Sequence, residues 1–203
     1  MNNLKFLGKL LYRIAYLTSY LYFKIVHRWK IKGKKNRPGE GPLIIMANHT
    51  SVLDPPIVGS VMNRQVHFMA KEELFKNPIF ERFLKGIGTF PVRRGKPDRK
   101  ALKNAFKLLK NDKVICIFPE GTRHKPDNLG QAKAGAVMIA LKSQAPILPI
   151  GIINTKNKEN LKISIGKPFT LDEYYNKKVK RDERKEVGNI IMNRIEQEIE
   201  SLK

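Results

Sequence analysis

Between residues 43 and 165 the chain alternates short apolar runs with longer stretches in which apolar residues recur at helical spacing. Short continuous apolar runs are typical of buried strands, and apolar residues three to four apart are typical of amphipathic helices. Strands are therefore predicted at 43–47, 66–70, 88–92, 113–118, 147–153 and 161–165. Helices are predicted at 55–63, 78–85, 98–111, 132–143 and 183–202. This alternation predicts an α/β fold with a mixed, largely buried sheet flanked by helices.

Residues 1–29 also follow a helical period, but basic residues interrupt their apolar pattern. The longest uncharged stretch, Ile14 to Phe23, has ten residues, well short of the roughly 20 that span a bilayer. Arg13 interrupts the apolar part and no small-residue cleavage site follows, so a cleaved signal peptide is not expected. We expect one or two helices that lie in a membrane surface, with aromatic rings at headgroup depth. These rings are Tyr12, Tyr16, Tyr20, Tyr22 and Trp29. An amphipathic helix packed on its own domain remains an alternative.

Positive charge is concentrated at the N-terminus. The first 37 residues carry ten Lys and Arg, and no acidic residue occurs before Glu40. The sequence Gly39-Glu40-Gly41-Pro42 predicts a break in the chain. We therefore divide it into a basic amphipathic segment, 1–37, expected to associate with anionic membrane lipids, and a folded domain, 38–203.

The whole chain has 40 Lys and Arg against 18 Asp and Glu, a formal net charge of +22. Such a charge favours polyanionic partners, either nucleic acid or an anionic lipid surface. No zinc-finger or RNP-type pattern occurs, and the N-terminal basic residues are interleaved with apolar ones. We therefore expect a membrane partner and no nucleic acid, with a basic nucleic-acid-binding protein as the least favoured alternative.

The cysteine and histidine content limits the disulfides and metal sites that the protein can form. Cys116 is the only cysteine and lies in an apolar run, so an intramolecular disulfide is excluded and a reducing compartment is indicated. The four histidines show no zinc-type spacing, and no metal is expected.

The segment Asn48 to Asp54 places His49 and Asp54 five residues apart, directly after the first predicted strand. That spacing corresponds to about 140° around a helix, so regular structure would point the two side chains apart. A strand-loop-helix junction, with Pro55 and Pro56 in the first helical turn, would bring them together. An imidazole oriented by a carboxylate is suited to general-base catalysis on a hydroxyl. Asp54 alone would also make a good helix N-cap, and that structural role stays open.

Three further segments combine backbone-shaping residues with polar groups: Gly88 to Arg94, Phe118 to Arg123, and Ala145 to Ile150. In the second, an acid, a glycine and an arginine follow a predicted strand, a combination typical of a polar ligand site. Each segment taken alone is also compatible with a turn and solvated side chains.

Together and in this order, these segments resemble the four ordered blocks of the glycerolipid acyltransferase family, and in particular the bacterial 1-acylglycerol-3-phosphate acyltransferases. The blocks are Asn48-His49-x4-Asp54, Gly88 to Arg94, Phe118 to Arg123, and Pro146-x-x-Pro149, with lesser matches at 69–74 and 133–136. The resemblance covers roughly residues 41–165. One departure is His124, where the family often has serine.

The resemblance implies that residues 38–203 form an acyltransferase domain. It would move a fatty acyl group from acyl-CoA or acyl carrier protein to the sn-2 hydroxyl of lysophosphatidic acid (1-acylglycerol 3-phosphate), giving phosphatidic acid without a cofactor. His49 would be the base and Asp54 would orient it. Lys71, Arg94 and Arg123 would bind the phosphate. Glu120 would accept hydrogen bonds from the glycerol or from neighbouring donors, and Gly121 would allow close approach of the backbone.

Two points are left open by the resemblance. Sibling enzymes use another acceptor, such as glycerol 3-phosphate or a different lysophospholipid, and these remain alternatives. The expected location is the cytoplasmic face of the cell membrane, with the protein attached peripherally or monotopically.

Overall fold

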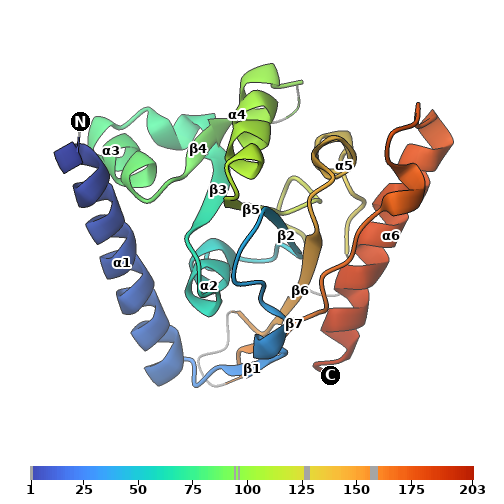
Figure 1. Cartoon of the computed structure of the whole chain (residues 1–203). Helices are drawn as coiled ribbons and strands as arrows, with labels where there is room; N and C mark the ends of the chain where they lie inside the picture. The colour runs from blue at the N-terminus through green and yellow to red at the C-terminus, as the bar shows by residue number, and fades with distance from the viewer. Residues whose placement is uncertain (1, 94, 96, 126–128, 156–159) are drawn as a thin grey trace.

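Seven strands form one sheet at the centre of the molecule (Figure 1). The computed structural model describes residues 2–93, 95, 97–125, 129–155 and 160–203, with side chains from Leu7 onward. The strands are β1 (Lys30–Lys32), β2 (Leu43–Ala47), β3 (Val66–Lys71), β4 (Phe90–Val92), β5 (Val114–Ile117), β6 (Ile147–Ile153) and β7 (Lys162–Ile165). Their spatial order is β1-β7-β6-β2-β5-β3-β4.

The sheet is mixed, as predicted. The strands β2, β3, β4, β5 and β6 run parallel, whereas β7 pairs antiparallel with β6, and β1 pairs parallel with β7. The central strand β2 is buried along its whole length, in agreement with its continuous apolar run. Because parallel strands end at the same edge, the loops after β2, β3, β4 and β5 gather on one side of the sheet.

Helices cover both faces of the sheet. They are α1 (Asn2–Ile25), α2 (Asp54–Val61), α3 (Pro78–Gly86), α4 (Arg99–Lys110), α5 (Ala134–Ser143) and α6 (Arg181–Glu200), with short 3-10 turns at Lys34–Asn36, Glu72–Phe75 and Asp172–Tyr174. One core cluster joins the sheet to α4, α5 and α6, and the other joins it to α1 and α2. In Figure 1, α1 and α6 lie on opposite sides of the sheet.

Local sequence explains where several helices begin. Asn77 caps α3 by accepting from the amides of Ile79 and Phe80, and Asp98 caps α4 by accepting from that of Ala101. In α6 the predicted stripe of Val187, Ile191, Ile195 and Ile199 is buried. The predicted strands and helices agree with the structure to within about two residues at most ends.

The basic run Lys30 to Arg37 contains an element that the sequence analysis missed. Residues Lys30–Lys32 form β1, the edge strand beside β7. The sequence pattern predicts this run only as a lipid contact, because three residues with two exposed lysines carry too weak an apolar pattern for a strand. The predicted division at residue 37 stays a prediction, although this strand extends the sheet into the N-terminal segment.

The part of the N-terminal segment before β1 forms one helix, α1, in the described residues, and this helix has two apolar faces. One face packs on the domain: Phe23 is buried, and the hydroxyl of Tyr12 donates to the carbonyl of Arg64 and accepts from the amide of Val66. The other face exposes Leu7, Leu10, Ile14, Leu17, Leu21 and Ile25. The alternative of a helix packed on its own domain is therefore correct for one face of α1.

Most of the aromatic rings predicted at headgroup depth lie partly against the protein, and their depth in a membrane stays a prediction. Tyr12, Tyr16, Tyr20 and Trp29 are half-buried, and only Tyr22 is exposed. Trp29 packs against Tyr20 and Phe23, and these contacts join the start of β1 to the end of α1. None of the described helices is long and apolar enough to cross a bilayer.

Candidate active site

The loop between β2 and α2 brings His49 and Asp54 into direct contact. Strand β2 ends at Ala47 and α2 begins at Asp54, so the chain turns between them as the spacing predicted. The Nδ1 atom of His49 lies 2.8 Å from Oδ2 of Asp54. Both residues are buried, with Asp54 fully inaccessible and His49 6% exposed.

Asp54 is held by the loop that it follows. Its Oδ2 also accepts hydrogen bonds from the amides of Thr50 and Ser51, each at 2.7 Å. The N-cap position of α2 belongs to Leu53, and no side chain caps the helix there. The N-cap alternative for Asp54 is therefore wrong, since the carboxylate turns back toward His49. The oxygen that faces His49 is therefore a hydrogen-bond acceptor toward two backbone amides.

This contact selects one tautomer of His49. Because Oδ2 of Asp54 accepts from two amides, it also acts as the acceptor toward the imidazole, so Nδ1 carries the proton and Nε2 carries the lone pair. Phe118 stacks on the imidazole, with ring centroids 4.2 Å apart and an interplanar angle of 20°. Among the described residues no hydrogen bond occupies Nε2. The lone pair is therefore available to a hydroxyl.

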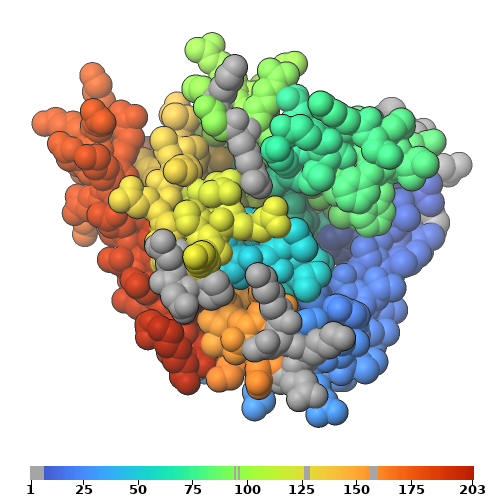
Figure 2. Space-filling view, turned by 180° about the vertical axis from the view of Figure 1, so that it is seen from behind, coloured from blue at the N-terminus to red at the C-terminus, as the bar shows by residue number. Residues whose placement is uncertain are grey.

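The segment after β5 holds the backbone of His49 from both sides. Oε1 of Glu120 accepts from the amide of His49 at 2.9 Å, and the amide of His124 donates to the carbonyl of His49 at 2.8 Å. Oε2 of Glu120 accepts from the amide of Gly130 at 3.3 Å. The blocks after β2 and β5 thus form one unit, and Figure 2 shows their surfaces side by side.

Gly121 adopts the backbone conformation for which glycine is favoured. Its φ is +72°, and its amide donates to the carbonyl of Phe118 at 3.0 Å, closing the turn that aims Glu120 inward. A Cβ atom at this position would lie 3.1 Å from Cγ of Lys133. Glycine is therefore favoured at position 121 by the turn itself and by the neighbouring Lys133. The predicted close approach of its backbone to a substrate stays a prediction.

Sequence reasoning gave no role to Asn48 and Thr155, which brace the loop. The side chain of Asn48 donates to the carbonyl of Ile152 and accepts from its amide, both at 2.8 Å, which joins the end of β2 to β6. The hydroxyl of Thr155 lies 3.3 Å from that of Thr50. The sequence indicated a role for Asn48 only through its position directly before His49.

The two described residues expected to bind phosphate are exposed, whereas His49 and Asp54 are buried. Arg123 is exposed but directly precedes His124, so its backbone lies beside His49. Lys71 ends β3, is exposed, and pairs with Glu73 at 3.3 Å. Arg94 lies outside the described residues. The structure thus groups His49, Asp54, Glu120 and Gly121. The two described basic residues are exposed at the same edge of the sheet, after β3 and β5, and we call this exposed border of the site the rim.

Comparison with known proteins agrees with this geometry. A family model described as Acyltransferase matches residues 28–153, well over half of the chain. The chain belongs to the acyltransferase family. The resemblance inferred from the four blocks is confirmed, and the protein is an O-acyltransferase.

This acyltransferase is similar to several proteins of known name. It is 35% identical over 147 residues to the 1-acyl-sn-glycerol-3-phosphate acyltransferase of Bacillus subtilis, covering 69% of this chain and 73% of that protein. It is 32% identical to the Streptococcus pneumoniae enzyme of the same name, over 78% of this chain and 60% of the relative. Its fold matches the crystal structure of the LPA acyltransferase of Thermotoga maritima with a TM-score of 0.70 at 25% identity, over 96% of this chain and 80% of the other.

His124, the departure from the family pattern, has a defined place in this acyltransferase. Its Nε2 lies 3.6 Å from Oε2 of Glu120, and a Cβ atom on Gly130 would lie 2.6 Å from that nitrogen. The ring therefore occupies space that only a glycine at position 130 leaves free. His124 contributes to the support of Glu120 and not to the imidazole–carboxylate pair itself.

Cys116 lies in the core below the site and is not placed as a nucleophile. It is buried in β5, and burial raises the pKa of its thiol well above the usual value, with the nearby charge of Asp54 acting in the same direction. In the described part of the chain no group of three or more His, Cys, Asp or Glu could hold a metal ion. The expected absence of a cofactor stays a prediction.

Proposed function

We propose that this acyltransferase moves a fatty acyl group from a thioester donor to the sn-2 hydroxyl of 1-acylglycerol 3-phosphate, giving phosphatidic acid. The observation that carries the proposal is the buried contact of 2.8 Å between His49 and an Asp54 anchored by two amides. Membership of the family and relatives named for this reaction support the choice of acceptor.

The reaction follows from the tautomer of His49. Nε2 takes the proton of the sn-2 hydroxyl as that oxygen attacks the thioester carbonyl, and Asp54 stabilises the imidazolium that forms. Collapse of the tetrahedral intermediate breaks the C–S bond. The proton then passes from Nε2 to the departing thiolate, so His49 returns to its starting state and no acyl-enzyme forms.

Recognition of the phosphate is assigned to the basic residues at the rim. A guanidinium presents several donors in a planar fork that matches phosphate oxygens, which suits Arg123 and Arg94. Lys71 would add a flexible charge from the end of β3. We assign Glu120 to positioning His49 and not to binding glycerol, because its side chain is only 1% exposed and each of its oxygens accepts from a protein amide.

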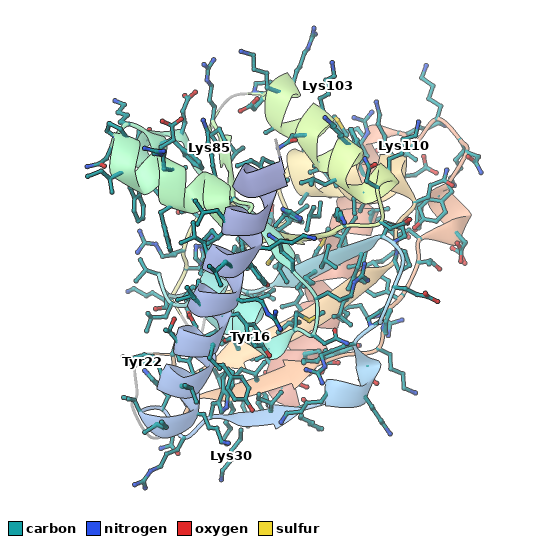
Figure 3. All side chains as sticks on the ribbon, turned by 60° about the vertical axis from the view of Figure 1, so that its left-hand side comes forward. Tyr16, Tyr22, Lys30, Lys85, Lys103 and Lys110 are labelled. Atoms are coloured by element: carbon teal, nitrogen blue, oxygen red, sulfur yellow. The ribbon has the colours of Figure 1, made fainter. Side chains whose placement is uncertain are left out.

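We also propose that the protein attaches peripherally to an anionic membrane through the exposed apolar face of α1. This face continues toward α3, where Ile79, Phe80 and Phe83 are exposed. Figure 3 shows α3 crossing near the N-terminal end of α1, with Tyr22 projecting outward near the other end. Surface attachment suits a lipid acceptor. The cytoplasmic leaflet is the expected side, because a lone buried thiol suits a reducing compartment.

The direct test is to assay the purified protein with 1-oleoylglycerol 3-phosphate in mixed vesicles, using palmitoyl-CoA and palmitoyl-ACP as separate donors. The expected products are phosphatidic acid and one free thiol per acyl group transferred. Parallel reactions with glycerol 3-phosphate and lysophosphatidylcholine measure acceptor choice. Faster acylation of either of these, or thioester hydrolysis without transfer, would contradict the proposal.

A further inference from the structure

Helix α4 carries a strongly basic face. Its twelve residues include five Lys and Arg and no acidic residue. At 100° per residue all five basic positions fall within an arc of about 100°, opposite the buried apolar face. They are Arg99, Lys100, Lys103, Lys107 and Lys110, all exposed.

This basic face begins at the edge of the sheet that holds His49. Strand β4 runs parallel with β3, β5 and β2, so its end at Val92 lies on the same side as the end of β2. The amide of Arg93 donates to Oδ2 of Asp98, the N-cap of α4, at 2.9 Å. This hydrogen bond therefore ties the second family block to the start of the basic helix.

The face differs from the surface assigned to the membrane. In the described part of the chain, every exposed large apolar side chain lies between Leu7 and Phe83, and none is on α4. A helix that enters a bilayer surface needs apolar side chains to bury. In Figure 3, Lys103 and Lys110 lie at the upper right and Tyr22 at the lower left. The chemistry and the direction of α4 therefore favour a soluble, negatively charged partner.

The dimensions of the face favour a protein as that partner. From Arg99 to Lys110 the helix rises about 16 Å, the length of three turns. Five charges spread over that length match an acidic helix laid alongside, and such complementarity raises the rate of encounter. Of acyl-CoA and acyl carrier protein, only the second presents its acyl group on a protein.

We propose that the basic face of α4 docks the acidic surface of acyl carrier protein, so that its thioester is delivered at the edge that holds His49. This inference rests on the proposed function. It adds a donor-specific docking surface: charges on α4 govern use of the carrier protein and have little effect on use of CoA thioesters.

The experiment compares two charge-reversal variants that change net charge equally. The test variant carries Lys103→Glu, Lys107→Glu and Lys110→Glu. The control carries Lys167→Glu, Lys178→Glu and Lys185→Glu, at exposed positions outside α4. Both are first checked for native circular dichroism and unchanged vesicle sedimentation, and are then assayed with palmitoyl-ACP and with palmitoyl-CoA.

In the test variant we expect the KM for palmitoyl-ACP to rise about tenfold or more, with kcat and the KM for palmitoyl-CoA within about twofold of wild type. The control should match wild type with both donors. An equal rise for both donors, no rise for either, or loss of vesicle binding with an unchanged carrier KM would overturn the inference. Wild-type activity with palmitoyl-CoA alone would also overturn it while leaving the proposed function intact, whereas no transfer from either donor would defeat the proposed function itself.

Discussion

The imidazole of His49 is fixed by contacts to its ring and to its backbone. Asp54 receives Nδ1–H, Phe118 covers one ring face, and Glu120 and His124 hold the amide and the carbonyl of the same residue. Each contact removes a different freedom: the tautomer, the tilt of the ring and the position of the main chain. The catalytic geometry therefore depends on residues that need not touch the substrate.

Replacing His49 with Ala should reduce kcat at least several hundredfold, because general-base catalysis contributes roughly 10² to 10⁴. The fold should survive, since the amide and carbonyl that bind Glu120 and His124 remain. Steady-state assays beside thermal unfolding measure both effects. Near-normal turnover in a folded variant would disprove the role of His49 as base.

Replacing Glu120 with Ala should lower kcat about tenfold to a hundredfold while changing the KM for lysophosphatidic acid little. The substitution leaves the amides of the buried His49 and the half-buried Gly130 without an acceptor, which should also destabilise the protein by about 1–3 kcal/mol. Kinetics at 10 °C, where the variant stays folded, separate the two effects. A large rise in KM with unchanged kcat would instead indicate that Glu120 binds glycerol.

The opposite pattern is expected for Arg123. Because this residue is exposed at the rim, Arg123→Ala should raise the KM for lysophosphatidic acid about tenfold with little change in kcat, through loss of a charge-assisted bond to phosphate. Melting temperature should not change. An unchanged KM would remove Arg123 from the phosphate site.

At the scale of elements, α1 combines two functions in one helix. Residues Leu11, Tyr12, Tyr16, Tyr20 and Phe23 lie on the face toward the domain, while the opposite face exposes a second apolar row. A soluble domain seldom keeps such a row in water, because large exposed apolar patches mark binding surfaces. Deleting the whole segment would also remove β1 and the core residue Phe23, so selective substitution is the sharper test.

Replacing Leu10, Ile14 and Leu17 with Ser should abolish sedimentation with anionic vesicles and leave the melting temperature nearly unchanged, because these side chains make no core contacts. A control with Lys185→Ser, Asn193→Ser and Glu196→Ser changes three exposed positions of α6. The control should sediment like wild type. Vesicle binding that survives in the α1 variant would place the membrane contact elsewhere.

For the whole molecule, the net charge of +22 acts together with the apolar face. Surface charges are screened over a Debye length of roughly 10 Å at 0.1 M salt. Binding to phosphatidylglycerol vesicles should therefore weaken steadily between 50 and 500 mM NaCl, while binding to phosphatidylcholine vesicles should be weaker and nearly independent of salt. Equal salt dependence for both lipids would show that charge does not contribute to attachment.

Most of the sheet and the central pair could be predicted from the sequence because their causes are local. Continuous apolar runs specify buried strands, and a histidine and an aspartate that flank a predicted turn are separated by only five residues. Strand β1 escaped prediction because its place at the sheet edge comes from pairing with β7, about 130 residues away. The four family blocks supplied the reaction class, which periodicity alone could not.

By itself the sequence determined the α/β class, the meeting of His49 with Asp54 and the basic character of the N-terminus. Only the tertiary structure decided that Glu120 serves the backbone of His49, that Asn48 joins β2 to β6, and that α1 has a buried as well as an exposed apolar face. The physical reason is the separation along the chain between the residues that interact. Patterns within a few residues reveal local geometry, whereas a hydrogen bond between the ends of neighbouring strands depends on a strand order that no single segment encodes.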